Sequence, residues 1–451
     1  MPHINYNKFK KAIGKQNANA ITNYSAFTVF SIRVAGAALA YLLQVFIARI
    51  IGTHHYGVFV VVWTLLVILV MFSNLGLSNS VSRFLPQYTS QGKASLVRGI
   101  LYGSRIAVFI CASAIAGIGA LGIWLLDDAI AQPYILPIAI ALTCLPLYTL
   151  CSLQEGIARA YNWQFLSVAP EYIWRPTLII IFMAIAVFLD FPRTAVTAVL
   201  CTIFAIWSIT AIQTLLLHKK LKKQCPPAPR QYQFKLWLQV SLPILLVDGF
   251  FQLLTSADVI IAGFWVPSDQ VAIYFAASRT VALLHFVYYA VRSATAMQIS
   301  QLYYTKNSRK LSEYIGRAAQ LTFWPTLILT AILLPCSPFL LSFFGEGYEK
   351  GFPVLLILTF GILARAAIGP VDSLLSLSGN QTLCAGIYAL TFAVNVGLNI
   401  SLAPSFGLIG IAIATSLAMI LEAILLIRGS YLRLGILPFF IPLHKKTVIE
   451  V

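Results

Sequence analysis

Residues 218–235 read HKKLKKQCPPAPRQYQFK, the longest polar run in an otherwise apolar chain of 451 residues. The run carries six Lys and Arg residues, and Pro226, Pro227 and Pro229 lie in its middle. Prolines exclude a continuous helix through it, and the charges exclude burial in lipid. We therefore expect two membrane-embedded halves joined by a basic linker: a six-helix bundle at 1–217, the linker at 218–235, a second six-helix bundle at 236–427 and a tail at 428–451.

The composition supports a membrane protein. The chain is 59% hydrophobic and 10% charged, whereas soluble proteins have about 25% charged residues. The net charge of +17 fits cations held on the cytosolic side of a membrane better than nucleic-acid binding. The seven cysteines form no CxxC motif, so neither a disulfide framework nor a zinc site is indicated.

Twelve apolar runs are long enough to cross a bilayer. They lie near 22–48, 56–77, 100–126, 133–153, 172–189, 194–217, 236–264, 270–292, 317–344, 352–376, 380–403 and 407–427. With the N-terminus in the cytosol, the inside segments hold 22 Lys and Arg residues, and the outside segments hold Arg49, Arg193 and Lys350. The positive-inside rule therefore predicts a multi-pass membrane protein with both termini in the cytosol.

The two halves resemble each other weakly. At an offset of 215, Ser78 and Tyr88 fall on Ser293 and Tyr303, and in both places a span is followed by a basic segment and another span. A parallel repeat of six plus six spans is typical of transporters.

Six arginines fall within the predicted spans, and depth divides them. Arg105, Arg175 and Arg292 lie within a turn or two of cytosolic ends and can extend to the headgroups. Arg33, Arg279 and Arg365 lie roughly 13–20 Å deep, where each costs about 2.5–3.5 kcal/mol. We expect these three to face an interior cavity.

Helical spacing places further polar residues on shared faces. Arg365 and Asp372 are seven residues apart, and Arg33 and Gln44 are eleven apart, which puts each pair on one face of a helix. Small residues beside Arg33 leave room for close packing or a ligand. The other candidates for the cavity or for ion coupling are Asp248, Asp258, His285, Arg292, Asn395 and Asn399.

These groups have two interpretations. They can pair with one another to hold the bundle together, or they can serve the function of the cavity. We favour pairing for Asp372 and Glu422, while for Asp248 and Asp258 we give pairing and function equal weight. For the deep arginines, too few acids lie at matching depth to neutralise them all, so an anion is expected. A diphosphate suits guanidinium groups, which bind phosphate oxygens bidentately.

Catalytic and metal sites are not indicated. His54-His55 and Asp127-Asp128 are best explained as loop residues, and no Walker, nucleophile-elbow or HExxH motif is present. We expect neither an enzyme nor a bound metal or cofactor.

Short motifs resemble a known family in their order along the chain. Ile47-Ala48-Arg49-Ile50-Ile51-Gly52 with Tyr56-Gly57-Val58-Phe59, Asn74-Leu75-Gly76-Leu77, Ser241-Leu242-Pro243, Phe344-Gly345-Glu346-Gly347-Tyr348 and Phe406-Gly407-Leu408-Ile409-Gly410 are similar to segments of Wzx-type oligosaccharide or O-antigen flippases. That family shares a superfamily with MATE-type multidrug exporters and lipid II flippases.

The resemblance implies two six-helix bundles in a V shape around a cavity that opens alternately to each side. It implies that an undecaprenyl-diphosphate-linked glycan is flipped across the bacterial cytoplasmic (inner) membrane for cell-surface polysaccharide synthesis, with a polysaccharide polymerase as a candidate partner. Coupling to a proton or sodium gradient is a further implication, with Asp248 or Asp258 as carrier. The alternatives are a MATE-type multidrug or cation antiporter and, with less support, a membrane glycosyltransferase or polymerase.

Overall fold

The computed structural model describes residues 15–125, 132–305 and 307–440, with side chains from residue 31 onward. Asp127-Asp128 and the last part of the predicted tail lie outside the described residues. The described chain is helical throughout. Its N-terminal half comprises α2 (Lys15–Ser73), α3 (Leu77–Ser90), α4 (Ala94–Leu125), α5 (Gln132–Ala160), α6 (Gln164–Ala169), η2 (Pro170–Trp174), α7 (Arg175–Phe188) and α8 (Ala195–Gln224). Its C-terminal half comprises α9 (Phe234–Trp265), α10 (Ser268–Val281), η3 (Ala282–Leu284), α11 (His285–Tyr304), α12 (Ser308–Ser342), η4 (Tyr348–Gly351), α13 (Phe352–Ile368), α14 (Val371–Leu377) and α15 (Gln381–Leu434).

Two of these helices are too long to cross a membrane only once. A straight helix of the length of α2, 59 residues, would span about 88 Å, against a hydrocarbon core of about 30 Å. Each long helix breaks at a glycine: α2 at Gly52 (φ 76°) and α15 at Gly407 (φ 55°). These are left-handed conformations that glycine adopts without a steric cost. Gly52 lies between predicted spans one and two, and Gly407 is the first residue of predicted span twelve.

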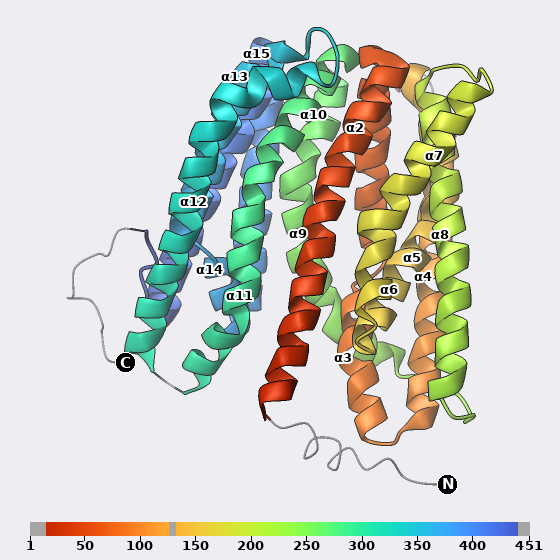
Figure 1. Cartoon of the computed structure of the whole chain (residues 1–451), viewed down its shortest axis with the longest axis vertical. Coiled ribbons are helices and arrows are strands. Elements are labelled where there is room, and N and C mark those ends of the chain that lie inside the picture. The colour runs from red at the N-terminus through yellow and green to blue at the C-terminus, as the bar shows by residue number, and fades with distance from the viewer. Residues whose placement is uncertain (1–14, 126–131, 306, 441–451) are drawn as a thin grey trace.

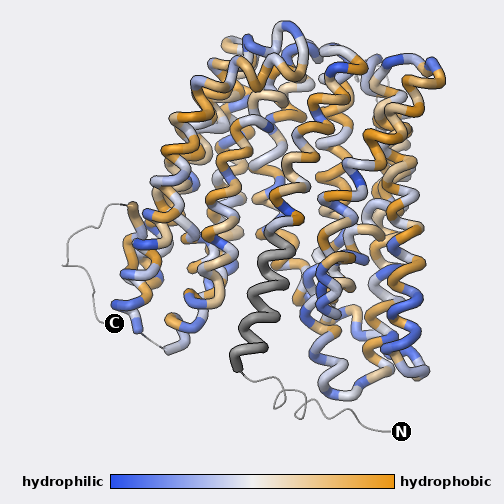
Figure 2. Tube along the Cα trace, in the orientation of Figure 1, coloured by the Kyte–Doolittle hydropathy of each residue, from blue (hydrophilic) through white to orange (hydrophobic). Residues whose placement is uncertain are grey.

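An all-helical membrane protein is confirmed. In the described part of the chain, ten helices are long and apolar enough to cross a bilayer. Two of the ten contain the breaks at Gly52 and Gly407, so this number does not count crossings, and twelve spans remains a prediction. Figure 2 shows apolar residues along most of the helix lengths, with hydrophilic residues gathered toward their ends.

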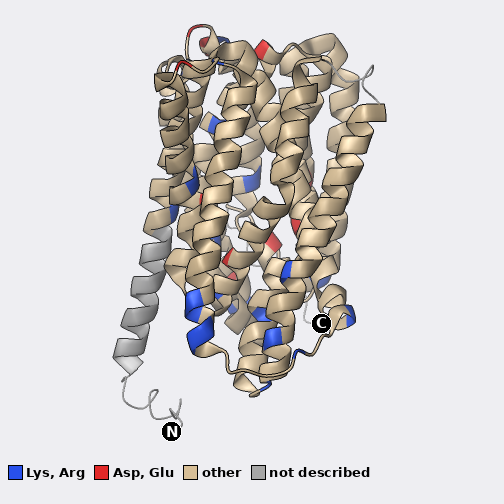
Figure 3. Cartoon of the chain, turned by 90° about the vertical axis from the view of Figure 1, so that its right-hand side faces the viewer, with Lys and Arg blue, Asp and Glu red and all other residues tan. Residues whose placement is uncertain are grey.

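The two halves stand side by side and converge at one end (Figure 1). We call this end, where α2 breaks, the Gly52 end, and the opposite end, where residues 225–233 join the halves, the linker end. Toward the linker end α11 and α12 diverge from α2 and α3, which gives the expected V shape (Figure 1). Figure 3 shows Lys and Arg gathered at the linker end, as the positive-inside rule predicts for a cytosolic side.

Direct contacts hold the halves together at the Gly52 end. Arg49 of α2 donates from Nε to the Phe343 carbonyl (2.6 Å) and from Nη2 to the Ser342 carbonyl (2.8 Å) at the end of α12. Gly57 lies so close to Ser268 that a Cβ added there would sit 1.8 Å from the Ser268 carbonyl oxygen. The structure is therefore closed at this end.

The linker differs from a free hinge. Helix α8 continues to Gln224, so the lysine-rich part of the predicted linker is helical, and the chain leaves the helix at Cys225, just before the prolines. The following segment packs on α4: the Gln231 amide donates to the Ser95 carbonyl (3.1 Å), and Arg230 lies 3.7 Å from the centre of the Tyr102 ring.

The start of α9 also packs on the N-terminal half. Trp237 is fully buried in a core formed by α3, α4 and α5, and its Nε1 donates to the Tyr88 hydroxyl (3.1 Å). The bundle boundary predicted at 236 therefore assigns to the C-terminal half a residue whose packing belongs to the N-terminal half. Sequence alone does not show this packing, because Trp237 lies inside the apolar run that forms α9.

Candidate functional site

A cavity of about 540 Å³ lies between the halves, and we call it the main chamber. Its walls come from α2, η2 and α7 on one side and from α9, α10, α11, α13 and α15 on the other. A second cavity of about 420 Å³, the linker-end chamber, adjoins it. Five residues line both: Val67, Tyr148, Glu171, Arg175 and Gln252. Both halves therefore contribute to one divided space.

Several predicted residues lie in this space. Gln44, Asp258, Arg279, His285 and Arg365 line the main chamber, and Asp248 lines the linker-end chamber. The small residues beside Gln44 also line the main chamber, and Gly36 permits a close approach: a Cβ there would lie 2.5 Å from the Tyr172 Cβ. Asp248 accepts a hydrogen bond from the Asn79 amide (2.9 Å), which connects α9 to α3 across the two halves.

Other predicted residues lie elsewhere. Arg33 is exposed outside both chambers, with its guanidinium 5.9 Å from the ring centre of Tyr172. Asn395 and Asn399 are fully buried within the C-terminal half, and the Asn399 amide donates to the Asn395 side-chain oxygen (2.9 Å). Placing these two asparagines in the cavity was wrong. Their spacing of four gave a shared helix face, but that face turns into the bundle rather than toward the space between the halves.

Arg365 is paired with an acid. It is buried and forms an ion pair with Glu422 of α15, which is fully buried. The expected face shared with Asp372 does not exist, because α13 ends at Ile368 and Gly369 (φ 62°) turns the chain before α14 begins. Asp372 instead accepts a hydrogen bond from the Tyr288 hydroxyl (2.5 Å).

Arg292 is also paired. Its guanidinium lies 3.3 Å from Asp372 and donates from Nε to Ser373 (3.0 Å). The pairing that we favoured from sequence for Asp372 and Glu422 is therefore present, and it uses two of the arginines within the spans. Neither Arg292 nor Asp372 lines either chamber.

Asp258 is held by the protein. It is buried, with 4% of its surface exposed, and it accepts hydrogen bonds from the Tyr274 hydroxyl (2.5 Å) and the Val259 amide (2.9 Å). These two donors satisfy a carboxylate that would otherwise be costly to bury. The Asp258 carboxylate is thus satisfied by groups of the protein itself and is not exposed to a ligand in the chamber.

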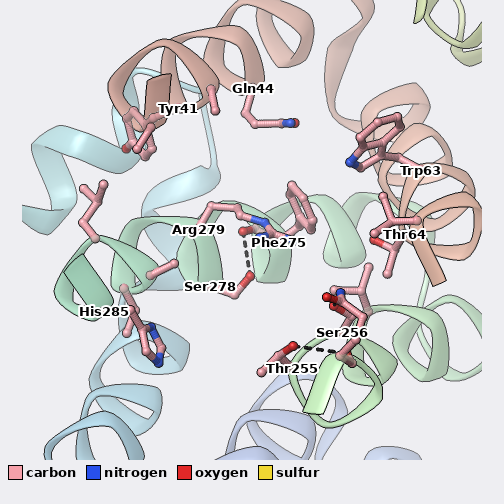
Figure 4. Close-up of a pocket in the computed structure, with 18 of the residues that line it drawn as sticks. Tyr41, Gln44, Trp63, Thr64, Thr255, Ser256, Phe275, Ser278, Arg279 and His285 are labelled. Carbon is pink, nitrogen blue, oxygen red and sulfur yellow. Dashed lines mark hydrogen bonds between the residues drawn. The ribbon is translucent and has the colours of Figure 1, made fainter. Parts of the chain in front are cut away.

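Arg279 has a different environment. It is exposed to the main chamber, packs over the Phe275 ring (4.5 Å), and has no carboxylate within 4.0 Å among the described residues. Figure 4 shows its side chain extending across the centre of the cavity, with Gln44 and Trp63 of α2 on neighbouring walls. A guanidinium in this position can take an anion that enters the chamber.

A charged and aromatic cluster in the N-terminal half was missed. Arg175, expected to reach the headgroups, lines both chambers and donates to the Tyr148 hydroxyl (2.5 Å). Glu171 lies 4.0 Å from Arg175, one helical turn earlier. Glu155 lines the linker-end chamber. The i, i+4 spacing of Glu171 and Arg175 was a readable signal, but both acids fell in a predicted loop, whereas the helices extend to Ala160 and resume at Gln164.

The expected excess of buried positive charge is also wrong. The two chambers together are lined by Glu155, Glu171, Asp248, Asp258 and Glu422 and by Arg159, Arg175, Arg279 and Arg365. The charges of the main chamber differ in how they are compensated. Arg365 is paired with Glu422, and Asp258 accepts hydrogen bonds from a hydroxyl and a backbone amide, whereas Arg279 has no acid within 4.0 Å in the described part of the chain.

The fold is shared with known transporters. A multidrug MATE transporter of the MOP superfamily, in an inward-facing conformation, superposes with a TM-score of 0.71 at 14% identity, over 90% of this chain and 98% of that one. The lipid II flippase MurJ, in an inward closed conformation, superposes with a TM-score of 0.66 at 16% identity, over 89% of this chain and 87% of that one.

Relatives are found at the level of sequence too. The probable flippase AglR of Haloferax volcanii is 29% identical over 180 residues, 38% of this chain and 37% of AglR. A putative O-antigen transporter of Shigella flexneri is 26% identical over 200 residues, 44% of this chain and 46% of the relative. The probable low-salt glycan biosynthesis flippase Agl15 of H. volcanii is 23% identical over 408 residues, 89% of this chain and 82% of the relative. The match thus spans well under two thirds of the first two relatives.

Two family models match the chain. The MatE model matches residues 243–404. The model described as polysaccharide biosynthesis protein matches residues 24–297, which is 274 of the 451 residues. This multi-pass membrane protein therefore belongs to the polysaccharide biosynthesis protein family.

Proposed function

We propose that this protein is a flippase that moves a lipid-linked oligosaccharide across the bacterial cytoplasmic membrane by alternating access, with undecaprenyl diphosphate as the lipid carrier. The observation that carries the proposal is Arg279, a cation exposed to a cavity between two helical halves and without an acidic partner among the described residues. A guanidinium binds diphosphate oxygens through paired, charge-assisted hydrogen bonds. The names of the relatives, two probable flippases and a putative O-antigen transporter, support the same activity.

The geometry suggests how such a lipid would be handled. The linker end faces the cytosol, so the headgroup reaches Arg279 through the linker-end chamber while the polyprenyl tail stays in lipid. Release on the other side requires the Arg49 contacts to Ser342 and Phe343 to open. Arg33 and Arg365 contribute less to the diphosphate than Arg279, because Arg33 lies outside the chambers and Arg365 is paired. Transport of this kind breaks no covalent bond, so the protein acts as a carrier and not as an enzyme.

The experiment that tests this proposal is lipid extraction from a strain lacking the protein. We expect undecaprenyl-linked oligosaccharide to accumulate while surface polysaccharide disappears. Expression of the wild-type chain reverses both effects, whereas expression of Arg279→Gln does not. The matched control is Arg193→Gln, which changes an exposed arginine between α7 and α8 and behaves as wild type. Absence of any accumulated lipid in the deletion strain contradicts the proposal.

A second candidate function is export of cationic drugs. The observation that favours it is the set of acids in the linker-end chamber, Glu155, Glu171 and Asp248, together with the match of residues 243–404 to the MatE model. This function predicts that the deletion strain becomes sensitive to cationic drugs without accumulating a glycolipid, so the same strain separates the two candidates.

A further inference from the structure

Two aromatic side chains of the N-terminal half lie together on the wall of the main chamber. The rings of Trp63 (α2) and Tyr148 (α5) have centroids 5.9 Å apart and planes inclined by 20°. Both line the main chamber, both are only partly buried, and Tyr148 also lines the linker-end chamber. Figure 4 shows the Trp63 indole projecting from its helix into the cavity. We call this pair the aromatic platform.

Arg175 fixes the platform in place. Its guanidinium lies 5.3 Å from the Trp63 ring centre and 5.6 Å from the Tyr148 ring centre, and it donates to the Tyr148 hydroxyl (2.5 Å). Glu171, 4.0 Å away, balances its charge. Arg175 follows directly on the π-helical turn Pro170–Trp174, and such turns alter the direction of side chains in a helix and are frequent at functional sites. The rings are therefore held before any ligand arrives, which lowers the entropic cost of binding.

Hydrogen-bonding groups surround the platform without forming an anion site. The Glu171 side chain is 44% exposed, and Asn79, Ser152 and Glu155 lie in the adjoining chamber. Carboxylate, amide and hydroxyl groups accept or donate hydrogen bonds to hydroxyl groups. The linker-end chamber is lined by three acids, Glu155, Glu171 and Asp248, and by two arginines, Arg159 and Arg175, so its lining offers no excess of positive charge to hold a uronic acid. The platform and its surroundings thus suit a neutral or amino sugar, whereas Arg279 suits an anion.

We propose that the aromatic platform is the glycan subsite of the cavity, separate from the diphosphate subsite at Arg279. One face of a pyranose ring presents C–H groups, which pack against the electron-rich face of an aromatic ring, while the sugar hydroxyls bond to Glu171 and to the polar groups of the linker-end chamber. This inference rests on the proposed function. It adds that the N-terminal half recognises the sugar and that neutral or amino sugars are preferred to acidic ones.

Binding measurements on the full-length protein in lipid nanodiscs test whether the glycan and the diphosphate bind at separate subsites. The probes are undecaprenyl diphosphate, the same lipid carrying a neutral N-acetylhexosamine disaccharide, and the same lipid carrying a disaccharide with one uronic acid. The variants are Trp63→Leu, which keeps apolar volume without an aromatic face, Trp63→Phe, which keeps an aromatic face, and Arg279→Gln. Trp207→Leu is the matched control, because Trp207 is an exposed residue of α8 that lines neither chamber.

The expected pattern is specific to a glycan subsite. Trp63→Leu weakens binding of the neutral glycolipid about five- to tenfold and leaves undecaprenyl diphosphate unchanged, while Trp63→Phe stays within about twofold of wild type. The uronic acid probe binds more weakly than the neutral one to the wild-type protein. Arg279→Gln weakens binding of all three probes, and Trp207→Leu changes binding of none.

Other outcomes overturn the inference in distinguishable ways. The glycan subsite is eliminated if Trp63→Leu weakens binding of the glycosylated and the bare lipid equally, or weakens binding of neither. It is also eliminated if Trp63→Leu and Trp63→Phe bind the probes with equal affinity. If the Trp63 pattern is as expected but Arg279→Gln binds every probe normally, the diphosphate role of Arg279 fails and the glycan subsite stands. Failure of the wild-type protein to bind any probe overturns the subsite and the proposed function together.

Discussion

Arg365 and Glu422 form an ion pair inside the C-terminal half, and 57 residues of sequence separate them. Both are buried, yet both line the main chamber, and the second carboxylate oxygen of Glu422 has no hydrogen-bond partner among the residues that the structure describes. An arginine that appears from sequence to be a free cation near the membrane midplane is thus compensated by an acid from another helix. Because Arg365 is paired, we propose Arg279 as the main cation for the substrate anion.

Arg365→Met should destabilise the protein because it leaves the Glu422 carboxylate buried and unpaired. Loss of one member of a buried pair typically costs about 3–5 kcal/mol, which lowers the melting temperature in detergent by several degrees. The double variant Arg365→Met/Glu422→Met removes both charges and should recover most of this loss. A single variant as stable as wild type would show that the pair does not hold the bundle.

Arg49→Ala should favour opening of the Gly52 end. The variant loses two charge-assisted hydrogen bonds to the carbonyls at the end of α12, where the helix dipole also favours a cation. A loss of about 1.4 kcal/mol changes the ratio of closed to open molecules about tenfold. Electron spin resonance measures this as a distance between labels at His54→Cys and Glu349→Cys, with exposed Cys336 replaced by Ser.

In this distance measurement, we expect Arg49→Ala to add a population of longer distances. Arg193→Ala, which removes an arginine from an exposed loop, is the control and should leave the distribution as in wild type. An unchanged distribution in Arg49→Ala would mean that the Arg49 contacts do not stabilise the closed end.

Gly57→Ala should exclude the closed arrangement by a steric clash. The added Cβ would meet the Ser268 carbonyl oxygen at 1.8 Å, and backbone atoms cannot move aside as a flexible side chain can. Overpacking of this kind costs about 1–3 kcal/mol, so the spin-label distances should lengthen and glycan export should fall about tenfold or more. Gly117→Ala is the matched control, because no atom of the described segments would come within 4 Å of its new Cβ. Normal export by Gly57→Ala would contradict the closed structure described here.

The linker segment should be ordered. Because the Gln231 amide donates to the Ser95 carbonyl of α4, its hydrogen exchange should be slow compared with an exposed loop. Gly99→Leu should accelerate it, since a Cβ at Gly99 would lie 1.7 Å from the Gln231 carbonyl oxygen. Hydrogen–deuterium exchange with mass spectrometry measures this. Fast exchange in the wild-type protein would contradict the packing of the linker on α4.

The long apolar runs, the two breaks and the proline-rich linker were readable from sequence because each depends on local chemistry. Length and hydropathy define spans, glycine permits the turns at Gly52 and Gly407, and prolines end α8. The packing of Trp237 on the N-terminal half was not readable, because it depends on which distant helix lies beside the start of α9.

The candidate site was predicted less completely for the same reason. Helical spacing relates residues within one helix, so it placed Gln44 and the small residues beside it on one face, and they do line the cavity. Spacing does not say what that face meets. It therefore put Asn395 in the cavity, left Arg365 without its partner Glu422, and missed the contact of Trp63 with Tyr148.

We propose above all that this protein flips a lipid-linked oligosaccharide through a cavity in which Arg279 holds the diphosphate. The direct test is reconstitution in liposomes with a fluorescent undecaprenyl-diphosphate disaccharide, whose movement between leaflets is followed by quenching from outside. We expect rapid exchange of the lipid between leaflets with the wild-type protein and with Arg193→Gln. With Arg279→Gln, we expect this exchange to be slowed about tenfold or more. Exchange no faster with the wild-type protein than in protein-free liposomes, or exchange unaffected by Arg279→Gln, would contradict it.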